Sequence, residues 1–233
     1  MLPSVKTKFV ANVAADSVGN LYATDAYQGV IYKADRNGEA SVWAKDLRLL
    51  PQDSLGFGVN GIAFFQGTDP ANPSGFFLLT RSGLTESAGG IYRISIDTGA
   101  ILRTSVDHGN YTGLFGSFGS LIINDRSGRA YTVASDNLVY EFVSTDNWQT
   151  AVLSAQYTVV CTSPVALQYV QSPYNDIYVL CNSGVSPYTI ERVRVAKYNV
   201  IPFVWRTASA NGASAVMPTI VLALVSMLLA ALL

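Results

Sequence analysis

The pattern of apolar and polar positions from Val13 to Ala44 organises this chain. Short runs rich in β-branched and aromatic residues alternate there with turn residues, and no 3.6-residue helical periodicity interrupts them. The turns fall at Asp16 to Asn20, at Gln28-Gly29 and at Asn37-Gly38, the last being a dipeptide whose residues both tolerate positive φ. Four short runs joined by three tight turns predict a four-stranded antiparallel sheet.

The same unit recurs along the chain. The aromatic residue of its second run falls at Tyr22, Phe77, Tyr131 and Tyr178, which gives a period of about 50 residues. The turn from Asp125 to Arg129 also repeats the Asp-x-x-Gly pattern of the first unit. Four strands in each such period predict an all-β fold, a β-propeller with four recognisable blades and no helix before the C-terminal tail.

Three segments are expected: a propeller domain over residues 1–206, a small polar linker over 207–215 and a hydrophobic tail over 216–233. The first blade begins within a few residues of Met1, and residues 1–8 lack the apolar core and cleavage site of a signal peptide. Either the ring closes with four blades or N-terminal blades are missing from this sequence, and we expect the latter.

The tail reads VMPTIVLALVSMLLAALL and carries no charge. Its length just reaches what a bilayer-spanning helix needs, so we expect a C-terminal hydrophobic helix that associates with a membrane. It is either a transmembrane helix or the signal for a GPI anchor attached at Ser209 or Asn211. No charged residue follows Leu233 to hold an end at the cytoplasmic surface, which favours the GPI anchor.

A tail of this kind places the propeller outside the cytoplasm, at the plasma membrane or an endomembrane. In that setting Asn110-Tyr111-Thr112 is a glycosylation sequon. Cys161 and Cys181, both in the fourth blade, then have two alternatives: a disulfide, or two buried thiols.

Charge and histidine content exclude several functions. The formal net charge of −1 gives no basic footprint, so nucleic acid is not an expected partner. The chain has one histidine, His108, which a Ser-His-Asp triad would need and which argues against zinc sites built from several histidines. Its polar surroundings predict a solvated turn residue.

The repeats also carry a family likeness. The segment from Val13 to Asp25, with Ile31 to Lys33 and Asn37 to Ser41 after it, resembles the senescence-marker/gluconolactonase/regucalcin propellers, and especially their plant calcium-dependent phosphotriesterase-like branch. NHL-repeat propellers share this blade signature. The resemblance implies a six-bladed propeller with calcium in its axial channel, held by a Glu, asparagines and an Asp. It also implies hydrolysis of lactones or organophosphate esters, with the metal polarising the attacked group.

Only part of that metal site matches. Asn60 corresponds to the family's metal asparagine, although Val59 stands where the family has proline, and Asn12 falls at a second, weaker match. Phe118 occupies the position of the Asp, with its ring expected beside the channel axis, and the Glu would lie upstream of Met1. Since calcium takes six to eight oxygens, the resemblance with these departures implies a degenerate site that binds calcium weakly or not at all.

Three functions follow as hypotheses. The first is a membrane-anchored, extracytoplasmic, gluconolactonase-like propeller with a degenerate metal site that binds an unidentified small molecule or protein in its channel or on its face. The second is an active calcium-dependent lactone or ester hydrolase whose remaining ligands lie in missing N-terminal sequence. The third is an NHL-like scaffold for protein interaction. Whether the chain is an enzyme stays open at this point.

Overall fold

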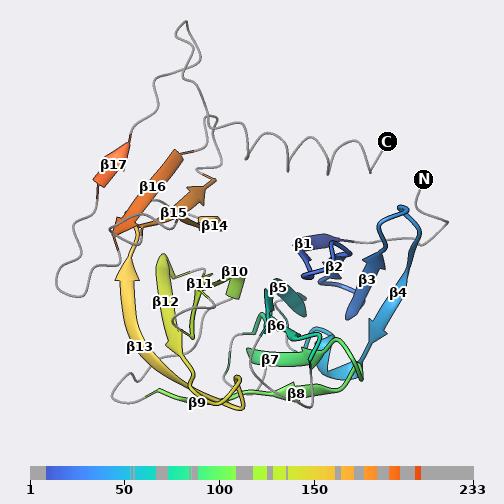
Figure 1. Cartoon of the computed structure of the whole chain (residues 1–233). Coiled ribbons are helices and arrows are strands. Elements are labelled where there is room, and N and C mark those ends of the chain that lie inside the picture. Colours follow the sequence, from blue (N-terminus) through green and yellow to red (C-terminus); the bar gives the residue numbers. More distant parts are fainter. Residues whose placement is uncertain are drawn as a thin grey trace, which may run out of the picture.

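The chain forms four small sheets that follow one another around an arc, with one strand of each sheet towards the middle (Figure 1). The structure is a computed structural model, and it describes residues 9–205 except 53, 55, 67–72, 84, 86–88, 109–117, 125–127, 135, 161–163, 171–175, 183–188 and 195–202. This all-β arrangement confirms the predicted propeller with four blades.

Blades 1 and 2 are antiparallel sheets whose strands are hydrogen-bonded in chain order. Blade 1 consists of β1 (Val10–Ala15), β2 (Leu21–Asp25), β3 (Val30–Ala34) and β4 (Ala40–Lys45). Blade 2 consists of β5 (Val59–Phe65), β6 (Phe76–Arg81), β7 (Gly90–Ser95) and β8 (Ile101–Arg103). Both blades match the units expected from the repeat.

Blades 3 and 4 continue the series. Blade 3 consists of β10 (Phe118–Asn124), β11 (Arg129–Ala134), β12 (Leu138–Val143) and β13 (Thr150–Thr158), with β9 (Ser105–Asp107) added at its outer edge. Blade 4 consists of β14 (Pro164–Val170), β15 (Asp176–Cys181), β16 (Thr189–Arg194) and β17 (Phe203–Trp205).

At the junction of blades 2 and 3 the chain forms two short strands, β8 and β9, instead of one. β8 ends at Arg103, and β9 pairs in parallel with β13 of the next blade. Thr104 causes the break, because its N–H donates to the carbonyl of Ile91 at 2.9 Å while its hydroxyl donates to the carbonyl of Trp148 at 2.9 Å. The chain is thereby bonded to both blades as it crosses between them.

The turn at Asn37-Gly38 differs from the two-residue hairpin turn that the dipeptide favours. Asp35 closes it, since its Oδ1 accepts from the N–H groups of Asn37 at 2.8 Å and Glu39 at 2.9 Å. Only Gly38 takes a positive φ, of 82°, so this is an Asp-built loop and not a two-residue turn. Asp16 builds the first hairpin, between β1 and β2, in the same way, by accepting from the N–H groups of Val18 and Asn20.

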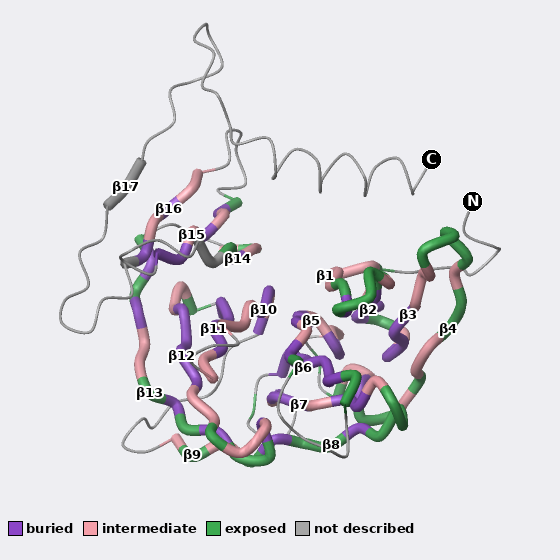
Figure 2. The backbone as a smooth tube through the Cα atoms, in the orientation of Figure 1, coloured by how far each residue is buried: buried purple, intermediate pink, exposed green. Residues whose placement is uncertain are grey.

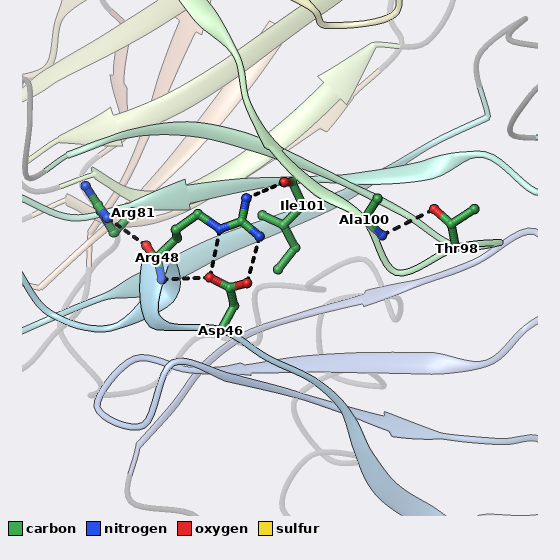
Figure 3. Close-up of polar contacts among 6 residues, drawn as sticks. All are labelled: Asp46, Arg48, Arg81, Thr98, Ala100 and Ile101. Carbon is green, nitrogen blue, oxygen red and sulfur yellow. Dashed lines mark hydrogen bonds and ion pairs between the residues drawn. The ribbon is translucent and has the colours of Figure 1, made fainter.

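The connector after blade 1 contains one turn of 3₁₀ helix, η1 (Leu47–Leu49). Arg48 fixes it: the guanidinium donates to both carboxylate oxygens of Asp46, at 2.8 and 2.7 Å, and to the carbonyl of Ile101 at 2.6 Å (Figure 3). Arg81 of β6 donates to the carbonyl of Arg48 at 2.7 Å. The connector is therefore tied to two strands of blade 2.

The hydrophobic core lies between successive blades. Tyr22 of blade 1 contacts Phe77 of blade 2 with ring centroids 4.4 Å apart, and a similar apolar cluster joins each later pair of blades. Burial is greatest on the second strands, β6 being buried throughout, whereas no residue of the outer strand β4 is fully buried (Figure 2). Inter-blade packing thus fixes the positions of the innermost strands β1, β5, β10 and β14.

Across the described ranges, no helix has the length and apolar character that a bilayer crossing requires. The expected linker and hydrophobic tail, residues 207–215 and 216–233, lie outside the described residues.

Candidate functional site

Three buried hydroxyls join the innermost strands of blades 1, 2 and 3. We call this set the hydroxyl belt; its members, Thr24, Thr80 and Ser82, have no exposed surface. Thr24 Oγ1 donates to the carbonyl of Asn60 at 2.6 Å, which links blade 1 to blade 2. Each of these innermost strands carries a bulge that interrupts the regular hydrogen-bond ladder. The belt bonds backbone groups that the bulge leaves without a ladder partner.

Blades 2 and 3 are joined by the other two members. Thr80 Oγ1 accepts from the N–H of Gly61 at 2.9 Å and donates to the carbonyl of Gly119 at 3.1 Å. Ser82 Oγ donates to the carbonyl of Phe118 at 2.8 Å. The belt therefore has a structural role, and it contacts the residues at which the metal site was expected.

The two candidate metal asparagines both contact the belt. The half-buried Asn60 donates through Nδ2 to Ser82 Oγ at 3.3 Å. The N–H of Asn12 donates to Thr24 Oγ1 at 3.2 Å, and its side-chain Oδ1 accepts from the N–H of Val13 at 3.2 Å. Asn12 lies on β1 and Asn60 on β5, so both belong to the innermost strands, which we call the inner rim.

Phe118, at the family's Asp position, lies in the core. Its side chain is 1% exposed, and its ring meets Tyr140 and Phe142 edge-on at centroid distances of 5.8 and 6.3 Å. The ring was expected beside the channel axis. It lies instead in the apolar cluster between blades 2 and 3. Among the described residues, no three His, Cys, Asp or Glu side chains gather as a metal site would require.

A cavity of about 310 Å³ opens beside this cluster, between blades 2 and 3. Its lining combines apolar, hydroxyl and cationic side chains from β7, β8, β9, β10 and β12; the residues are Gly90, Ile91, Arg103, Thr104, Ser105, Val106, His108, Phe118 and Phe142. Its size falls at the lower end of the range of small-molecule sites, about 300–1,000 Å³.

Sequence reasoning did not find this cavity. His108 was expected as a solvated turn residue, but it is only half exposed and belongs to the lining. Arg103 belongs to no recognisable sequence motif. The residues come together only because the chain crosses from one blade to the next at Thr104, and nothing in the repeat pattern marks that crossing.

A second buried polar cluster surrounds Glu141 on β12. Its carboxylate, 3% exposed, is paired with Arg129 and accepts from Ser154 Oγ at 2.7 Å and Tyr157 OH at 2.8 Å. Burial, together with this carboxylate, raises the pKa of Tyr131 well above its ordinary value. A buried charge with so many partners is satisfied by the fold, so we assign the cluster a structural role.

The remaining candidate residues are only partly described. Cys181 is fully buried on β15. Its expected partner Cys161, the glycosylation candidate Asn110 and the anchor candidates Ser209 and Asn211 lie outside the described residues. The disulfide, the glycan and the lipid anchor stay predictions.

Neither a family model nor a curated protein matches this sequence. Solved structures do share its fold. One is a catalytically inactive virginiamycin B lyase from Staphylococcus aureus with quinupristin, at a TM-score of 0.58 and 15% identity over 89% of this chain and 59% of that one. Another is a Bacteroides caccae protein of unknown function, at 0.51 and 16% over 87% of this chain and 61% of that one.

The major Malassezia sympodialis allergen Mala s 1 also shares the fold, at a TM-score of 0.52 and 16% identity over 79% of this chain and 49% of that one. The chain thus spans about half to three-fifths of the length of these structures. At such low identities the likeness shows a propeller fold and does not assign the chain to the gluconolactonase family or to any activity.

Proposed function

We propose that this chain is a membrane-anchored, extracytoplasmic binding propeller, descended from gluconolactonase-like hydrolases, whose axial metal site is degenerate. It recognises a small molecule or protein and does not carry out calcium-dependent hydrolysis. The observation that carries this proposal is the use of the former ligand positions by the fold itself.

That use is clearest at Phe118, which is packed among aromatic rings. At Asn60 the bond to Ser82 uses the amide Nδ2 and not the Oδ1 that would bind a metal. An asparagine offers one neutral oxygen, whereas calcium sites usually include carboxylates to offset the cost of dehydrating a doubly charged ion. With an apolar ring in place of the Asp, the described rim offers Asn60 and Asn12 as its candidate oxygens.

The cavity between blades 2 and 3 supports a binding role. It is a concave site with a few polar groups over an apolar lining, the usual composition of small-molecule sites. Propellers host many unrelated functions, so we rest this proposal on the site and not on the fold.

The membrane part of the proposal rests on the sequence. The uncharged stretch over residues 216–233 has the composition and length of a membrane anchor. The sequon at Asn110 fits a propeller that enters the secretory route.

Calorimetric titration of the full chain with calcium tests the degenerate site. We expect no binding in the micromolar range, and no difference between the parent chain and Asn60→Ala. The matched control is Asn12→Ala, which removes the weaker candidate ligand. Micromolar binding that Asn60→Ala abolishes would overturn the proposal and favour the hydrolase. Phe118→Asp is not a suitable gain-of-function test, because it buries a carboxylate in the core.

A further inference from the structure

We infer that the cavity between blades 2 and 3 binds a small organic anion with an apolar body, such as an arylalkyl carboxylate. This inference rests on the proposed binding function and names the ligand class for that site. It follows from the division of the cavity lining into an apolar part and a cationic part.

The apolar part comes from both blades. Ile91 belongs to blade 2, and Val106, Phe118 and Phe142 to the sheet of blade 3. Ile91, Phe118 and Phe142 are each 1% exposed, so this wall of the cavity is already packed in the core, and the apolar area removed from water on binding is mainly that of the ligand. Burial of apolar area is worth about 25 cal/mol per Å², which supplies affinity but little selectivity.

The cationic part is formed by Arg103, and His108 adds an imidazole to the polar side of the lining. Arg103 is exposed, and its guanidinium keeps its positive charge at any physiological pH. Thr104 and Ser105 add hydroxyls to this part of the lining. A planar guanidinium matches the two oxygens of a carboxylate, so this part of the lining favours an anion over a neutral or cationic head group.

Local contacts hold the cationic part in position. Arg103 Nη2 donates to the carbonyl of Gly89 at 3.1 Å, and Thr104 is bonded to both blades. Gly90 leaves room for the guanidinium, because a Cβ at that position would lie 3.3 Å from Arg103 Nη2. The site is therefore preorganised, which reduces the entropic cost of binding.

The single histidine allows a direct test. Because the chain has one histidine, a histidine-selective isotope label reports NMR signals from His108 alone. The labelled full chain, in lipid nanodiscs, is titrated with phenylbutyrate, and with phenylbutanol and phenylbutylamine at matched free concentrations. These probes share the apolar body and differ only in the charge of the head group.

We expect saturable shifts of the His108 signals with phenylbutyrate at concentrations where the neutral and cationic analogues give none. Arg103→Gln should weaken the apparent affinity about tenfold, the effect of removing roughly one charge-assisted hydrogen bond. Arg103→Lys, which keeps the positive charge but loses the planar fork, should weaken it by a smaller factor. The control Arg36→Gln, on blade 1, should leave the affinity unchanged.

Two results would overturn the inference. If the neutral analogue binds as tightly as the anion, the site is apolar but not selective for anions, and the proposed binding function still stands. If no probe shifts the His108 signals, the cavity is not a site for this class of ligand. A loss of folding in Arg103→Gln is recognised from its backbone spectrum, and Arg103→Lys then carries the test of the cationic part.

Discussion

Thr24 Oγ1 lies 2.6 Å from the backbone carbonyl of Asn60 and donates a hydrogen bond to it across the boundary between blades 1 and 2. The same hydroxyl accepts from the N–H of Asn12 at 3.2 Å. One buried side chain thus bonds two innermost strands, and it does so at the backbone of the residue that resembles a calcium ligand.

Thr24→Val should therefore destabilise the propeller. The change keeps the shape of the side chain but leaves a buried carbonyl and a buried N–H without this partner, at a cost of about 1–3 kcal/mol in the free energy of unfolding. Urea unfolding of the full chain measures the loss. The control is Thr158→Val at an exposed position of β13, for which we expect a change within about 0.5 kcal/mol. Equal losses in the two variants would show that the belt contributes nothing.

Acid should weaken the first hairpin through Asp16. Burial alone would raise the pKa of this carboxyl, but hydrogen bonds from Asn20, Tyr22 and Val18 lower it below the ordinary value of 3.8. A group with a depressed folded-state pKa stabilises the fold above its unfolded pKa and loses that contribution as the pH falls through the folded value. We expect Asp16→Asn to be less stable than the parent at neutral pH, with the difference narrowing below pH 3.8.

Unfolding midpoints of both proteins across an acid series measure this dependence. Glu39→Gln, at an exposed position, serves as the control for a lost surface charge. A stability difference between Asp16→Asn and the parent that stays constant down to the most acidic point would contradict the assignment.

The ion pair of Arg48 with Asp46 should make a measurable but small contribution to the free energy of unfolding. The geometry is bidentate, yet the Arg48 side chain is 51% exposed, and exposed ion pairs contribute at most about 1 kcal/mol. A double-mutant cycle with Arg48→Gln and Asp46→Asn isolates the pair. We expect a coupling energy of about 0.5–1 kcal/mol, with Arg48→Gln also losing the contact to Ile101. Strict additivity would mean that the connector is fixed by its other bonds alone.

If the tail is exchanged for a GPI anchor, cutting that anchor should release the protein from membranes. We expect phosphatidylinositol-specific phospholipase C to free the chain from cells, and replacement of both Ser209 and Asn211 by bulky residues to prevent anchoring. Retention after the enzyme treatment would favour a transmembrane helix instead. A tail-intact chain that is soluble without detergent would contradict both forms of the anchor.

The fold could be predicted from local signals. The spacing of Tyr22, Phe77 and Tyr131 reports inter-blade packing, and Asp-x-x-Gly turns such as Asp16 to Gly19 form within a few residues, so both are visible in the sequence. The strand break at Thr104 was not predictable. It depends on Trp148, which is 44 residues away and belongs to another blade.

The candidate site was predicted less well for the same reason. The resemblance at Asn60 predicted a site at the inner rim. Asn60, Asn12 and the backbone of Phe118 all contact the hydroxyl belt. Whether a side chain faces an open channel or a core is decided by the neighbouring blade. Hence the position of the Phe118 ring and the cavity beside Arg103 and His108 emerged only from the assembled sheets.

Hydrolysis by the full chain tests the central claim most directly. Purified protein is assayed with a lactone and with a phosphotriester, with calcium and with a chelator. Our account predicts no turnover above the uncatalysed rate under either condition, for the parent chain and for Asn60→Ala alike. Calcium-dependent turnover by the parent that Asn60→Ala removes would contradict the account, because the inner rim would then hold a working metal site.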